Sequence, residues 1–198
     1  MPAWLLAAYR TPSAPSTARV AAWRGLHGLG ALFLGPTVCL LPSALVDRRQ
    51  LANIVERVEA AGGSFDLLEV ESFGEDAERS LRGRYNDARD AEYAEVVERS
   101  DGMIEELVRE GAKGKFTFAE VEENEADLVK LQRWLRRIRA RDLFGAAGRA
   151  AAEGAVHKAA ARLEAFIGEA MAREGADVDA AEAEVAPAPR LKVVRGDR

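Results

Sequence analysis

The chain has little of what catalytic and metal sites are usually built from. It holds one cysteine, Cys39, and two histidines, His27 and His157. A single thiol excludes an internal disulfide and a cysteine metal cage, and it suits a reducing compartment. Neither histidine has a metal-ligand companion at helical spacing, and neither Ser43 nor Ser64 lies in a nucleophile-elbow motif. These absences predict a protein that is not an enzyme and that holds no metal or cofactor.

Long apolar runs are also absent. No stretch approaches the ~20 residues that a membrane span requires, and the apolar residues 3–8 follow no basic leader. We therefore expect a cytoplasmic protein with no membrane partner. A chain of 198 residues can bury a core as one domain, or as one domain with an appendage.

Charge is plentiful but unevenly distributed. The formal net charge is −5, from 28 basic and 33 acidic residues, and acidic residues outnumber basic ones about two to one over residues 71–125. Over residues 126–149 only Asp127 and Asp142 oppose a basic set: Lys130, Arg133, Arg136, Arg137, Arg139, Arg141 and Arg149. The whole molecule is not attracted to DNA, but one helix can be.

Short apolar runs and helical patterns alternate over the first 70 residues. Strands are expected at residues 3–9, 31–34, 38–41 and 64–70, and helices after the turn at 10–16 and over 42–62. In the first helix, Val20, Trp23 and Leu26 fall on the arc that should face the core. The strand, helix, strand, strand, helix, strand order is the ferredoxin-like arrangement. The predicted fold is α+β, with a ferredoxin-like βαββαβ core followed by a helical bundle.

The remainder of the chain has a helical pattern. Helices are expected over residues 75–110, 126–144 and onward to about 173, with a loop at 111–118. Possible inward positions of the first of these helices include Leu81, Tyr85, Tyr93 and Leu107. Ala, Glu, Asp and Pro dominate beyond residue 175, which predicts disorder. Three regions result: a ferredoxin-like domain at 1–72, a helical region packed on it at 73–174, and a disordered tail at 175–198.

The first candidate site is the corner between the first strand and the first helix. The hydroxyl and guanidinium groups that could bind an oxyanion there belong to Tyr9, Arg10, Ser13, Ser16, Arg19 and Arg24. A helix N-terminus favours anions, and the planar guanidinium matches tetrahedral oxyanions as well as phosphates. The alternative is structural, with these arginines paired to Glu69, Glu71 or the acidic helix.

The second candidate site is the basic helix, as a surface for nucleic acid. A stripe at three- and four-residue spacing, bordered by a tryptophan, comprises Lys130, Arg133, Trp134, Arg137 and Arg141. Such a stripe can contact phosphates. The alternative is ion pairing with the Glu-rich helix at 75–110. Because no helix-turn-helix signature is present, DNA contact is expected either on this stripe or on a surface that the sequence does not reveal.

A family resemblance rests on two stretches of sequence. The first is Trp4-Leu5-Leu6, Tyr9-Arg10-x-Pro12-Ser13-x-Pro15-Ser16 and Arg19-Val20-x-x-Trp23-Arg24-x-Leu26. The second is Arg141-Asp142-Leu143-Phe144-Gly145. Over about residues 3–170, and most specifically in the first thirty, the chain resembles the N-terminal domain of the chromate resistance regulators, the ChrB family. The resemblance implies chromate-responsive control of the transcription of resistance genes.

The first half also looks like the middle domain of phenylacetate-catabolism repressors and the small CRISPR-associated endoribonucleases. Those nucleases need an acidic residue where this chain has Tyr9-Arg10, so the resemblance does not extend to nuclease activity. Longer ChrB members carry a second domain, and if that domain senses chromate, we expect this chain to bind its partner without sensing. The leading hypothesis is a homo-oligomeric regulator that binds DNA and an oxyanion. The alternative is an oligomerising structural or adaptor module without direct DNA binding.

Overall fold

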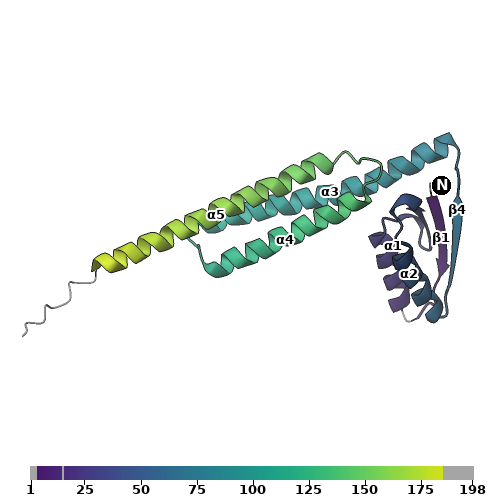
Figure 1. Cartoon of the computed structure of the whole chain (residues 1–198), viewed down its shortest axis with the longest axis horizontal. Helices are drawn as coiled ribbons and strands as arrows, with labels where there is room; N and C mark the ends of the chain where they lie inside the picture. The colour runs from purple at the N-terminus through teal and green to yellow at the C-terminus, as the bar shows by residue number, and fades with distance from the viewer. Residues whose placement is uncertain (1–3, 15, 185–198) are drawn as a thin grey trace, which may run out of the picture.

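The computed structural model in Figure 1 describes residues 4–14 and 16–184. It has two parts, a sheet with two helices and an elongated group of three long helices that extends away from it. We call residues 4–70 the N-terminal unit and the three long helices the helical arm. The predicted α+β class is confirmed.

The sheet has four strands, and every neighbouring pair is antiparallel. Its strands are β1 (Trp4–Arg10), β2 (Leu32–Gly35), β3 (Val38–Pro42) and β4 (Ser64–Val70), in the spatial order β2-β3-β1-β4. β1 lies inside the sheet, where Leu6 is opposite Leu40 on one side and Leu68 on the other. β4 therefore forms one edge of the sheet.

Helices α1 (Thr17–Gly28) and α2 (Arg48–Ala60) pack on one face of the sheet (Figure 1). Between them and the strands lies an apolar core that includes Tyr9, Leu26 and Leu41. The predicted helix over 42–62 begins later than expected, after a short 3-10 turn at Ser43–Leu45. The reason is Asp47, whose carboxylate accepts hydrogen bonds from the backbone N–H groups of two residues in the first turn of α2.

The inward face of α1 differs from the predicted one. Ala22 and Leu26 are buried, but Val20 is 38% exposed and Trp23 is 47% exposed. The cause is the approach of α2, since a Cβ atom at Gly25 would lie 2.8 Å from the Ile54 side chain. The small residue allows the two helices to pack closely and turns Trp23 away from the core.

Helix α3 (Glu75–Ala112) connects the two parts of the molecule. Near its start, Leu81 and Tyr85 pack with Trp4 and Leu40 on the face of the sheet opposite α1 and α2. Farther along, its buried positions belong to the helical arm, among them Tyr93 and Leu107. One helix thus contributes to the cores of both parts.

Helices α4 (Phe118–Arg141) and α5 (Arg149–Glu184) lie alongside α3 (Figure 1). α4 starts well before the predicted residue 126, because the Thr117 hydroxyl accepts a hydrogen bond from the Glu120 backbone N–H and caps the helix there. α5 continues to Glu184, past residue 175, where the disordered tail was predicted to begin; disorder of this segment stays a prediction. The rest of that prediction, 185–198, lies outside the described residues. None of the described helices combines the length and apolar character needed to cross a membrane.

Candidate anion-binding surfaces

Tyr9, the first residue of the predicted oxyanion corner, belongs to the hydrophobic core. Its side chain is buried, and its hydroxyl donates a hydrogen bond to the Pro36 carbonyl oxygen at 3.2 Å. Its ring stacks on Phe65, with 6.0 Å between the ring centroids. Burial raises the pKa of Tyr9 above 10.0. The phenol therefore supports the sheet and is not available to an anion.

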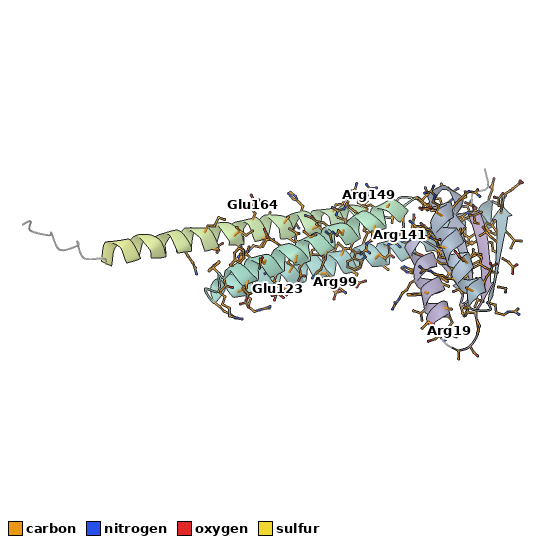
Figure 2. All side chains as sticks on the ribbon, turned by 60° about the horizontal axis from the view of Figure 1, so that its bottom comes forward. Arg19, Arg99, Glu123, Arg141, Arg149 and Glu164 are labelled. Atoms are coloured by element: carbon orange, nitrogen blue, oxygen red, sulfur yellow. The ribbon has the colours of Figure 1, made fainter. Side chains whose placement is uncertain are left out.

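The other corner residues are exposed, but they do not form one site. Ser16 occupies the N-cap position of α1, yet its hydroxyl makes no capping hydrogen bond. Arg19 and Arg24 are five residues apart, which at ~100° per residue places them on different sides of the helix. Figure 2 shows Arg19 at the end of α1 away from the arm, whereas Arg141 lies where the arm meets the N-terminal unit.

The arginines of the corner are not neutralised by the predicted acidic partners. Within residues 4–14 and 16–184, Arg10, Arg19 and Arg24 form no ion pair with Glu69, Glu71 or the acidic helix α3. Ser13 is exposed like Arg10. The corner thus consists of separate free cations, of which Arg24 faces a different part of the molecule.

Arg141, one of the predicted DNA contacts, is a structural residue. Its side chain is 13% exposed, and its Nη1 and Nη2 atoms lie 3.3 and 3.2 Å from the two carboxylate oxygens of Glu92 in α3. Nη1 also donates a hydrogen bond to the His27 carbonyl oxygen at the end of α1, at 3.0 Å. The guanidinium thus joins α1, α3 and α4, as the structural alternative for this residue expects, and a DNA contact here stays a prediction.

Glu92 also holds a second, deeper arginine. The Arg89 side chain is 3% exposed, its Nε atom lies 3.1 Å from the carboxylate of Glu92, and its guanidinium lies over the Tyr85 ring. Two guanidinium groups thus share one carboxylate, which leaves one positive charge uncompensated. Sequence reasoning missed this pair. The sequence does hold an indication that Arg89 is buried. It lies four residues after Tyr85 and four before Tyr93, both of which are buried on the same helix.

His27 lies at the edge of the same cluster. Its Nε2 atom is 4.0 Å from Glu92. Burial lowers the pKa of His27 below 6.5, and the nearby Arg141 and Arg89 lower it further, although Glu92 opposes them. The imidazole is therefore neutral at neutral pH and can act as a hydrogen-bond donor or acceptor.

The remaining basic residues of α4 form an exposed surface. Lys130 pairs with Asp127 at 2.7 Å, an exposed ion pair of little energetic weight. Arg133, Arg136 and Arg137 have no ion-pair partner in the described part of the chain. With Lys130 they line one shallow groove, and we call these four residues the basic face. Arg136 is a member that the predicted stripe did not include.

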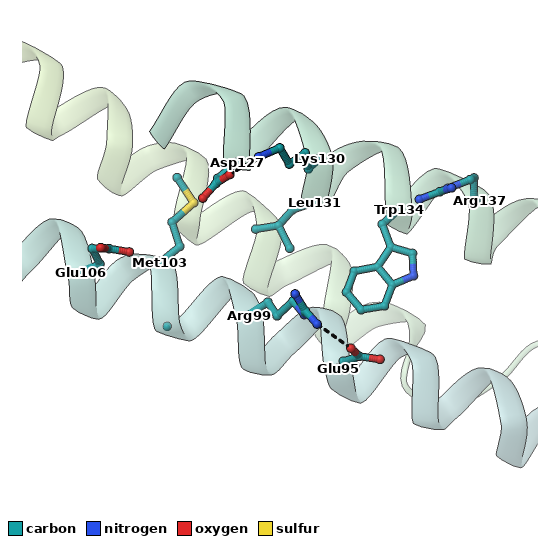
Figure 3. Close-up of a pocket in the computed structure, with 10 residues that line it drawn as sticks. Glu95, Arg99, Met103, Glu106, Asp127, Lys130, Leu131, Trp134 and Arg137 are labelled. Atoms are coloured by element: carbon teal, nitrogen blue, oxygen red, sulfur yellow. Dashed lines mark hydrogen bonds and ion pairs between the residues drawn. The ribbon is translucent and has the colours of Figure 1, made fainter. Parts of the chain in front are cut away.

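Trp134 lies beside the basic face, in a groove between α3 and α4 (Figure 3). The Arg99 guanidinium lies 5.4 Å from the centroid of its ring, and Arg99 also donates a hydrogen bond to Glu95 at 2.9 Å. Glu95 thus pairs with an arginine of its own helix and not with α4. The predicted pairing of α4 with the Glu-rich helix occurs for Arg141 but not for Arg133 or Arg137.

A further hollow is lined by residues of both predicted sites, the strand-to-helix corner and the basic stripe of α4. It has a volume of about 390 Å³ and is formed by residues of α1, α3 and α4, including Trp23, Arg24, Glu92, Trp134, Arg137 and Arg141. We call it the junction pocket. It brings Arg24 of the first candidate site together with Arg137 and Arg141 of the second. The exposed Trp23, whose ring centroid is 5.3 Å from that of His27, forms part of its wall.

No metal centre accompanies these surfaces in the part of the chain that the structure describes. Within residues 4–14 and 16–184, no group of three or more His, Cys, Asp or Glu side chains is placed to hold a metal ion. Cys39 is a buried free thiol, and burial raises its pKa to about 12. The chemistry that these surfaces offer is therefore that of guanidinium groups and indole rings.

Comparison with known proteins gives two matches. A family model described as the N-terminal part of Protein ChrB matches residues 19–176. Protein ChrB of Cupriavidus metallidurans is 33% identical over 93 residues, which is 47% of this chain and 28% of that protein. The chain therefore spans only part of that relative's length. The family match starts at Arg19, after the Tyr9–Ser16 stretch, and includes every helix of the structure at least in part. No solved structure matches the chain.

Proposed function

The chain belongs to the family of the ChrB N-terminal domain, which is linked to chromate resistance, and from this premise we propose that it is a cytoplasmic, non-enzymatic regulator that binds DNA and an oxyanion. The basic face of α4 contacts DNA. The observation that supports this assignment is the set of three neighbouring arginines, Arg133, Arg136 and Arg137, that lack a counter-charge in the described residues. Cations that are not already paired release condensed counterions from DNA when they bind phosphates.

The test is a DNA-binding titration with duplex DNA of mixed sequence over a range of salt concentrations. In the triple variant Arg133→Gln, Arg136→Gln and Arg137→Gln, we expect weaker binding. The slope of the salt dependence should fall by roughly 0.9 for each phosphate that the variant no longer neutralises. Arg141 is left unchanged, because its replacement would disturb the joint between the helices.

The matched control removes the same charge from another helix. Arg48, Arg49 and Arg57 are exposed on α2, and their replacement by glutamine should leave DNA binding intact. Equal affinity and an equal salt slope in the α4 variant and in the unsubstituted protein would refute DNA contact through this face. Repeating the titration with chromate tests whether an oxyanion alters the affinity.

A second candidate function is that of an oligomerising module without direct DNA binding. We propose that the N-terminal unit is ferredoxin-like, followed by a helical bundle, which the β-α-β-β-α-β order and the antiparallel sheet support. Its edge strand β4 carries Leu67 and Leu68, 43% and 53% exposed, and an unpaired strand edge is a template for a second copy. The variant Leu68→Lys separates the two functions when its oligomeric state is measured by sedimentation and its DNA affinity by titration. If the oligomer is lost and DNA binding is retained, the result favours the regulator.

A further inference from the structure

We infer that the junction pocket is the site of the oxyanion, a tetrahedral dianion held between Arg24 of α1 and Arg137 of α4 above the Arg141–Glu92 pair. This inference rests on the oxyanion part of the proposed function and moves its site away from the strand-to-helix corner. The pocket is lined from three helices that belong to both parts of the molecule. A ligand there would contact the N-terminal unit and the helical arm at the same time.

The charge around the pocket favours an anion. Arg24 and Arg137 form no ion pair among the described residues, and both line the pocket. Behind them, Arg141 and the buried Arg89 share the single carboxylate of Glu92. Four guanidinium groups against one carboxylate leave a surplus of three positive charges. A dianion would offset two of them, so the pocket remains attractive even when it is occupied.

The donors also match the shape of the ligand. A guanidinium presents its N–H groups in a planar fork that can hold two oxygens of a tetrahedral anion, and such charge-assisted hydrogen bonds are among the strongest in proteins. Indole walls from Trp23 and Trp134 flank the arginines, and His27 adds a ring that is neutral at neutral pH.

The pocket lies at the joint between the two parts of the molecule. In the described residues, this joint depends on the ring cluster of Trp4, Tyr85 and Phe144, and on the Arg141 hydrogen bond to the His27 carbonyl. An anion bound by both Arg24 and Arg137 adds a bridge between α1 and α4. Because Arg137 also belongs to the basic face, the bound anion would come either from solution or from the DNA backbone itself.

Tryptophan fluorescence offers a direct readout, since Trp23 and Trp134 line the pocket whereas Trp4 is fully buried elsewhere. Sulfate is titrated against the whole chain at constant ionic strength, maintained with chloride. We expect a saturable change in the unsubstituted protein. In Arg24→Gln and in Arg137→Gln, the apparent affinity should fall at least about tenfold, as expected when one charge-assisted hydrogen bond is removed.

Arg19→Gln is the matched control, because it removes an unpaired arginine from the same helix outside the pocket. Unchanged sulfate binding in this control supports the site. Equal binding by Arg24→Gln, Arg137→Gln and the unsubstituted protein would overturn the pocket as the site while leaving the oxyanion part of the proposed function in place. An unsubstituted protein that shows no response to sulfate overturns both.

Duplex DNA identifies the source of the anion. If Arg24→Gln no longer binds sulfate but binds DNA as tightly as the unsubstituted protein, the pocket takes a free anion. If it binds neither, and sulfate competes with DNA in the unsubstituted protein, the pocket takes a backbone phosphate. Circular dichroism of each variant confirms that the fold is retained, as expected for exposed side chains.

Discussion

The N-terminal unit and the helical arm both have apolar cores, but they differ in the polar groups that are buried beside those cores. The core between the sheet, α1 and α2 consists of apolar side chains and Tyr9. In contrast, all the buried polar residues of the described part lie on α3 or α4: Arg89, Ser100, Glu110 and Asn124. Apolar burial has no preferred direction, whereas hydrogen bonds and ion pairs fix one geometry. The unit therefore depends on its apolar packing, whereas the arm combines apolar packing with a few directional bonds.

The largest expected effect comes from removing the charge of Glu92. In Glu92→Gln, Arg89 and Arg141 are deprived of their shared carboxylate while one of them stays buried, which should lower the free energy of unfolding by about 3–5 kcal/mol. Urea unfolding measures the decrease. Glu95→Gln is the control, because among residues 4–14 and 16–184 this exposed residue pairs only with Arg99 of its own helix. Equal effects of the two substitutions would contradict a special role for Glu92.

The apolar unit should respond to a cavity. Leu41 is fully buried in the core under α1 and α2, and Leu41→Ala should lower the free energy of unfolding by about 2–5 kcal/mol. Leu67 on the edge strand β4 is 43% exposed, so Leu67→Ala should cost clearly less in the same urea experiment. If the two alanine variants lose equal stability, burial under α1 and α2 does not decide how much a side chain contributes on this face of the sheet.

The smallest effect is a pH dependence at the joint. Burial lowers the pKa of His27 in the folded protein, so the unfolded chain takes up a proton there at higher pH than the folded chain does. The contribution of His27 to the free energy of unfolding is therefore fully present above about pH 6.5 and declines as the pH falls below that value. His27→Gln should remove this part of the decline, and thermal unfolding across the range measures it. The control is His157→Gln, at an exposed histidine, which should leave the decline in stability unchanged.

Periodicity in the sequence predicted much of both regions. The apolar seam of α3, with Leu81, Tyr85, Tyr93 and Leu107, follows directly from its three- and four-residue spacing. The polar members of that seam were missed, because an arginine such as Arg89 indicates a surface position unless it is known to face a carboxylate. Val20 and Trp23 were assigned to the core because the inward face of α1 depends on Gly25 meeting Ile54, a tertiary contact.

The junction pocket could not be predicted from sequence for a related reason. Its walls come from helices whose contact residues, such as His27 and Arg141, are 114 positions apart. Spacing along a single helix could identify Arg137 as exposed, but it could not bring Arg24 beside it. The two candidate sites therefore appeared as separate features of one chain, and only the packing of α1 against α4 joins them.

The uninterrupted course of α3 has a mechanical consequence. Its 38 residues form one rod that starts beside the sheet and ends at the turn into α4, far along the arm, a span of roughly 57 Å at 1.5 Å per residue. With a lever of this length, a tilt of about 5° at the sheet moves the tip by about 5 Å. Small displacements around Trp4 and Tyr85 are thus amplified into movements as large as a side chain at the far end of α3.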